Sequence, residues 1–91
     1  MTPAERIGAG RILIVEADAI EATVYGDYLT QRQYTVDVAH SLAAARTALA
    51  RVHYDAVVLD LHLPDGDSTA LVADIRAQGL RTAVVILTAD P

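Results

Sequence analysis

Asp-Ala-Val-Val-Leu-Asp-Leu-His-Leu-Pro-Asp-Gly, residues 55–66, is the stretch that decides the fold. The apolar run at 56–59 predicts a strand buried on both faces, as the strands of a parallel sheet are. The run ends in a carboxylate, Asp60, and the chain must turn soon afterwards because Pro64 presets φ and Gly66 permits a positive φ. The stretch therefore predicts a buried strand with an acid at its C-terminal end, where a loop begins.

The composition is that of one small globular domain. Hydrophobic residues make up 53% of the 91 positions, too many for a disordered chain, yet no apolar run reaches the roughly 18 residues of a membrane span. The net charge is −5 and lysine is absent, which argues against direct binding to nucleic acid. Cysteine is absent too, which excludes disulfides and thiolate metal sites but says nothing about the cellular compartment. The N-terminal residues lack the pattern of a signal peptide. We therefore expect a cytoplasmic protein that is not associated with a membrane.

Three further apolar runs predict strands. Residues 12–15 are apolar at every position and are followed by Glu16. In residues 34–39 apolar and polar side chains alternate, which is typical of a strand at the edge of a sheet. Residues 82–87 form a run typical of a buried strand, which ends at Thr88. Residues 1–10 show no periodicity, and we interpret them as a flexible lead-in to a domain that occupies residues 11–91.

Helical patterns separate the four predicted strands. The expected N-caps are Asp18, Ser41, and either Asp67 or Ser68. The residues expected to face the core are Ile20, Val24, Tyr28 and Gln31 in the first helix, Leu42, Ala45, Leu49 and Val52 in the second, and Leu71, Val72 and Ile75 in the third. Gly79 suits the C-terminal end of the third helix.

Strands that alternate with helices predict a parallel sheet with helices on both faces. Right-handed crossovers then place the carboxyl ends of all strands at one edge, where Glu16, Asp60 and Thr88 follow three different strands. Open α/β sheets bind their ligands at this edge. The sequence therefore predicts a functional site that contains these three residues.

Residues 11–89 resemble the receiver domains of two-component response regulators. The resemblance rests on Ile-Leu-Ile-Val-Glu-Ala-Asp at 12–18, Thr-Val-Asp-Val-Ala at 35–39, Tyr-Asp-Ala-Val-Val-Leu-Asp-Leu-His-Leu-Pro-Asp-Gly-Asp at 54–67, and Val-Ile-Leu-Thr-Ala at 85–89. It implies a flavodoxin-like (CheY-like) α/β fold with strand order 2-1-3-4, in which the family's fifth strand and last helices are absent from this chain.

The resemblance also implies a chemistry. Asp60 would accept a phosphoryl group from a histidine kinase or phosphotransfer protein in a phosphorelay, with Mg²⁺ neutralising charge. Glu16, Asp60 and the backbone carbonyl of His62 would hold the Mg²⁺, and Asp18 is a further candidate ligand. Thr88 would hydrogen-bond the phosphoryl group and move inward. The expected role is that of a signalling module, with at most self-phosphorylation and slow autodephosphorylation as enzyme activities.

Two departures from the family pattern modify this expectation. The family usually has two adjacent acids after its first strand, whereas here Glu16 is followed by Ala17, so we expect weak Mg²⁺ binding. The family's phosphate-neutralising lysine has no counterpart in this chain. Without a fifth strand, residues 82–87 would form an exposed apolar edge, which predicts a homodimer, strand exchange or aggregation.

Two other functions stay open at this stage. The first is a pseudo-receiver, a protein–protein interaction or dimerisation module that acts without phosphorylation. The second is a flavodoxin-like enzyme or nucleotide-binding domain, which is disfavoured because no glycine-rich phosphate loop follows residues 12–15. Under every reading, Asp65 and Asp67 are expected as turn and cap residues, and the ring of His62 as solvated.

Overall fold

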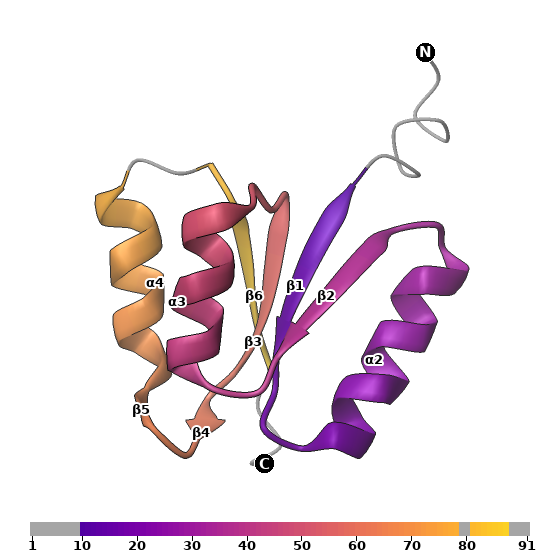
Figure 1. Ribbon diagram of the computed structural model, residues 1–91, viewed down its shortest axis with the longest axis horizontal. Helices are drawn as coiled ribbons and strands as arrows, with labels where there is room; N and C mark the ends of the chain where they lie inside the picture. The colour runs from indigo at the N-terminus through magenta and orange to yellow at the C-terminus, as the bar shows by residue number, and fades with distance from the viewer. Residues whose placement is uncertain (1–9, 79–80, 88–91) are drawn as a thin grey trace.

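The computed structural model describes residues 10–78 and 81–87. Within these residues the chain forms a four-stranded sheet of β1 (Arg11–Val15), β2 (Thr35–Ala39), β3 (Ala56–Asp60) and β6 (Ala83–Leu87). The strands lie in the order β2-β1-β3-β6 and every pair is parallel, which confirms the predicted sheet (Figure 1). The expectations for the lead-in before Gly10, for Gly79 and for Thr88 lie outside the described residues.

Helices cover the two faces of this sheet unequally. α2 (Ala19–Gln31) lies on one face, and α3 (Leu42–Arg51) and α4 (Ser68–Ala77) lie side by side on the other (Figure 1). Each helix begins where a side chain accepts hydrogen bonds from its first turn, and the three predicted N-caps Asp18, Ser41 and Asp67 are confirmed. Such a cap is worth about 1 kcal/mol of stability, so these residues fix the helix starts.

The hydrophobic core lies between the sheet and the pair α3 and α4. Tyr54 is its largest member, and its hydroxyl donates a hydrogen bond of 2.6 Å to Oδ2 of Asp37. Burial and the neighbouring carboxylate raise the pKa of Tyr54 to about 12. The other buried residues of this core are Leu13, Val15, Ala39, Leu42, Ala45, Val57, Leu59, Leu63, Leu71 and Ile75.

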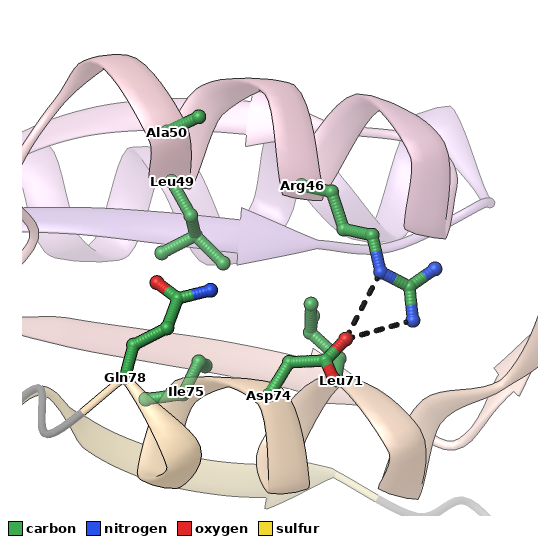
Figure 2. Close-up of a pocket in the computed structure, with 7 residues that line it drawn as sticks. All are labelled: Arg46, Leu49, Ala50, Leu71, Asp74, Ile75 and Gln78. Carbon is green, nitrogen blue, oxygen red and sulfur yellow. Dashed lines mark hydrogen bonds and ion pairs between the residues drawn. The ribbon is translucent and has the colours of Figure 1, made fainter.

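A shallow cavity of about 150 Å³ remains between α3 and α4 (Figure 2). Leu49, Leu71 and Ile75 contribute its apolar lining, and Arg46 of α3 reaches Asp74 of α4 in an ion pair of 3.1 Å. Both charged side chains are about half exposed, so the pair contributes at most about 1 kcal/mol. The cavity is a gap in helix packing, and neither Glu16 nor Asp60 lines it.

The prediction for the buried face of α2 is wrong. Ile20, Val24 and Tyr28 are 77%, 60% and 55% exposed, whereas Ala22 is buried. Ala22 and Gly26 instead lie on the side of α2 that faces the sheet, so the helix approaches the strands through its smallest side chains. A stripe of apolar residues at helical spacing indicates an amphipathic helix, but the packing distance decides which face is buried.

The prediction that β3 is buried on both faces is also wrong, and so is the prediction that residues 82–87 form a buried strand. Val57 and Leu59 of β3 are buried against α3 and α4, but Val58 on the opposite face is only half-buried. In β6, Val85 and Ile86 are 50% and 47% exposed. Val58 and Val85 are in register and share one face, and α2 packs on β1 and β2, which leaves that face of β3 and β6 uncovered among the described residues. Ile86 is in register with the buried Leu59 on the other face, and it is exposed because β6 is the edge strand of the described sheet. The expectation of an apolar, exposed edge agrees with this arrangement.

Across residues 10–78 and 81–87, every helix is too short or too polar to cross a membrane.

Candidate functional site

Two acids meet at the carboxyl edge of the sheet. Val15 of β1 is in register with Leu59 of β3, so Glu16 and Asp60 follow neighbouring parallel strands at the same level. The side chain of Glu16 is only 3% exposed. Its burial raises its pKa, and the hydrogen bond and negative charge of Asp60 raise this pKa further, against a lowering contribution from the backbone N–H of Asp18. Two carboxylates that repel one another in a protected position favour a bound cation.

Asp60 sits at the end of β3, half-buried, and its loop holds it at two points. Its Oδ1 accepts a hydrogen bond of 3.1 Å from the backbone N–H of His62. The Ser68 hydroxyl at the start of α4 donates a 2.7 Å hydrogen bond to the backbone carbonyl of Asp60. Both ends of the loop are therefore tied to the acid, which restricts the directions its carboxylate can take.

The loop itself forms a small hairpin. β4 (His62–Leu63) pairs antiparallel with β5 (Gly66–Asp67), and the chain reverses at Pro64 and Asp65. Gly66 has φ +145°, a conformation that side chains other than glycine rarely adopt. The turn expected after Asp60 is therefore confirmed, together with the need for glycine at position 66.

Asp18 does not join the two acids. Its Oδ1 accepts hydrogen bonds from the backbone N–H groups of Ile20 (2.8 Å) and Glu21 (3.0 Å), so its carboxylate is engaged at the N-terminus of α2. In the part of the chain that the structure describes, no three Asp, Glu or His side chains gather as a metal centre. Of the predicted site residues, the structure brings Glu16 and Asp60 together, places His62 two residues further on, and does not describe Thr88.

The donor chemistry at this edge suits a hard cation such as Mg²⁺. The groups that the structure brings together are the carboxylates of Glu16 and Asp60, both of them oxygen ligands. Ala17 supplies no side-chain ligand. The edge could therefore hold a metal through two carboxylates, with water needed for most of the coordination shell.

Two neighbours of the site were missed at the sequence level. His40 follows β2, and its Nδ1 donates a 2.8 Å hydrogen bond to the backbone carbonyl of Glu16. Asp65, expected as a turn residue, accepts hydrogen bonds from the backbone N–H groups of Leu42 (2.8 Å) and Ala43 (3.0 Å) of α3. These hydrogen bonds lower the pKa of Asp65. The position of His40 directly after an edge strand was the one signal that could have pointed to it; for Asp65 the local sequence holds none.

The strand order β2-β1-β3-β6 defines a flavodoxin-like fold, and the paired acids lie at the carboxyl edge where such folds bind their ligands. Residues 12–91 match the model of the response regulator receiver domain. This chain therefore belongs to the family of response regulator receiver domains, found in two-component systems.

Relatives of known name and structure agree with this membership. The transcriptional regulatory protein TcrA from Mycobacterium tuberculosis is 39% identical over an alignment of 87 residues that covers 92% of this chain and 33% of TcrA. Protein RcaC from Microchaete diplosiphon is 35% identical over 80 residues, 88% of this chain and 12% of RcaC. The chain thus spans a third or less of the length of these two relatives.

Two solved structures show the same fold. The MaeR response regulator bound to beryllium trifluoride superposes with a TM-score of 0.83 at 28% identity, over 90% of this chain and 69% of MaeR. The response regulator TrrA from Thermotoga maritima, in complex with Mg²⁺ and beryllium fluoride, gives a TM-score of 0.84 at 25% identity, over 89% of this chain and 70% of TrrA.

Proposed function

We propose that this chain is a phosphoacceptor module in which Asp60 receives a phosphoryl group from a histidine kinase or phosphotransfer protein. In this step a carboxylate oxygen of Asp60 bonds to phosphorus while the phosphorus–nitrogen bond of the phosphohistidine breaks. The observation that carries the proposal is the placement of Asp60 at the end of β3, at the carboxyl edge of the sheet and beside Glu16. We expect the module to act in the cytoplasm, without direct binding to nucleic acid.

The residues that would hold Mg²⁺ are Glu16, Asp60 and the carbonyl of His62. When bound, the metal would neutralise charge on the transferred phosphoryl group. Because Ala17 contributes no carboxylate and Asp18 is engaged as a helix cap, we expect weaker Mg²⁺ binding than a third carboxylate would give. Thr88, which follows β6 in sequence, remains the proposed hydrogen-bonding partner of the phosphoryl group.

The decisive experiment is intact-mass measurement after incubation with Mg²⁺ and acetyl phosphate, a small phosphodonor. The wild type should gain one phosphoryl group, and Asp60→Asn should gain none. Asp67→Asn is the matched control, because it removes an acid from the same loop without touching Asp60, and it should still be phosphorylated. If the wild type shows no adduct, the phosphoacceptor function is refuted for this chain.

A pseudo-receiver is the second candidate, and one observation favours it. The carboxylate nearest to the missing acid, Asp18, is bonded to the first turn of α2 and is not free to replace the side chain absent at Ala17. Ala17→Asp therefore provides a test, because Mg²⁺ affinity measured by titration should rise if a ligand is missing. Unchanged affinity would mean that another group already occupies that role.

We also propose that the 91-residue chain associates with itself, as a homodimer or by strand exchange. Val85 and Ile86 expose about half of their surface on β6, and Ile20, Val24 and Tyr28 form an exposed apolar stripe on α2. Exposed apolar edges of this kind favour pairing with a second chain. Sedimentation should show dimers or larger species that Val85→Lys converts to monomers. A wild type that stays monomeric at high concentration would contradict this proposal.

A further inference from the structure

The loop that follows Asp60 is hydrogen-bonded to the N-terminus of α3, a helix distant in sequence. Asp65 lies five positions beyond Asp60, and its two carboxylate oxygens accept hydrogen bonds from the N–H groups of Leu42 and Ala43, 23 and 22 residues earlier in the chain. The next N–H group of α3, that of Ala44, donates to the hydroxyl of Ser41 at 3.1 Å. The N-terminus of α3 is thus capped jointly by its own Ser41 and by Asp65 from the loop.

The hairpin also packs directly on this end of α3. A Cβ added to Gly66 would lie 3.2 Å from Cδ1 of Leu42, which is tighter than most real contacts. Leu63 of the same hairpin is buried in the core that Leu42 shares. The loop therefore has little space in which to shift relative to α3, and the charge-assisted hydrogen bonds of Asp65 fix its position along the helix end.

The opposite side of the hairpin holds Asp60. The N–H of His62 donates to Oδ1 of Asp60, and the hydroxyl of Ser68 donates to its carbonyl. His62 is in β4 and pairs with Asp67 of β5, so its N–H group moves with the hairpin. A displacement of the hairpin away from α3 would change the direction from which His62 approaches the carboxylate.

We propose that Asp65 is a positioning residue for Asp60: its bonds to α3 hold the hairpin, and the hairpin holds the orientation of the Asp60 carboxylate. This inference rests on the proposed phosphoacceptor function. Asp65 does not touch the reacting atoms. Its effect is expected on the rate of phosphorylation because phosphoryl transfer depends chiefly on alignment and charge neutralisation.

Asp65→Ala and Ser41→Ala form a matched pair for the test. Each variant removes an acceptor from the N-terminus of α3, but only Asp65 belongs to the loop of Asp60. With acetyl phosphate and Mg²⁺, Asp65→Ala should slow phosphorylation by about tenfold, less than the roughly hundredfold cost of a 1 Å misplacement. Ser41→Ala should keep the wild-type rate. Asp65→Asn, which retains one acceptor oxygen, should recover part of the rate.

A second measurement separates positioning from the chemistry. Hydrogen exchange of the His62 amide reports its bond to Asp60 without any phosphodonor, and this exchange should speed up in Asp65→Ala but not in Ser41→Ala. Equal rates of phosphorylation and of His62 exchange in the two variants would overturn the inference and leave Asp65 as an ordinary helix cap. If the wild type takes no phosphoryl group, the proposed function fails, and the His62 exchange alone decides whether Asp65 positions the loop.

Discussion

Replacement of Gly26 by alanine should stabilise the protein. Gly26 lies in the middle of α2, where glycine costs about 0.8–1.0 kcal/mol relative to alanine because of its backbone freedom. The structure shows room for the new methyl group: a Cβ at this position would lie 3.9 Å from both Cδ1 of Ile14 and Cγ1 of Val36, which is ordinary van der Waals contact. The substitution should therefore gain the higher helix propensity of alanine without a steric penalty.

Thermal and urea unfolding, followed by circular dichroism at a concentration where the chain is monomeric, measure this effect. A gain of about 1 kcal/mol should raise Tm by roughly 4–8 °C in a domain of this size, with an unchanged urea m value. Gly66→Ala is the control of opposite sign, because φ +145° and the 3.2 Å approach to Leu42 should cost about 1–3 kcal/mol. A destabilised Gly26→Ala would refute the reasoning, since α2 would then have to approach the sheet more closely than the structure shows.

Three further predictions concern titratable groups. In metal-free buffer, Glu16→Gln should raise the free energy of unfolding at neutral pH. The pKa of Glu16 is raised beside Asp60, so the wild type loses stability as pH rises through that pKa, and the glutamine variant does not. Equal free energies of unfolding would contradict this. Tyr54→Phe should cost about 1.5 kcal/mol through the lost bond to Asp37, and it should remove the loss of stability expected in the wild type between pH 10 and about pH 12. The lowered pKa of Asp65 stabilises the wild type, and this stabilisation is lost when the carboxylate is protonated on acidification below pH 4. Asp65→Ala should therefore lose less of its free energy of unfolding over this pH range than the wild type does.

Local patterns in the sequence were sufficient for much of the fold and for the centre of the site. The four apolar runs, the three N-caps and the turn at Pro64 and Gly66 all depend on residues within a few positions of one another, and the structure confirms them. Parallel topology then requires Glu16 and Asp60 to share one edge. These features could be predicted because their physical causes are short-range sterics, capping hydrogen bonds and the handedness of the crossover.

Other features were decided only by the tertiary structure. The hydrophobic pattern predicted Ile20, Val24 and Tyr28 on the inner face of α2, but Ala22 and Gly26 face the sheet instead. How closely a helix backbone approaches a sheet depends on the side chains of the opposite surface, which the helix sequence does not contain. Which elements cover β6 likewise depends on the whole packing arrangement. The sequence by itself determined that Asp60 would stand at the end of a strand of the parallel sheet. Only the folded chain could show that Asp65 fastens its loop to α3, because that bond joins residues more than twenty positions apart.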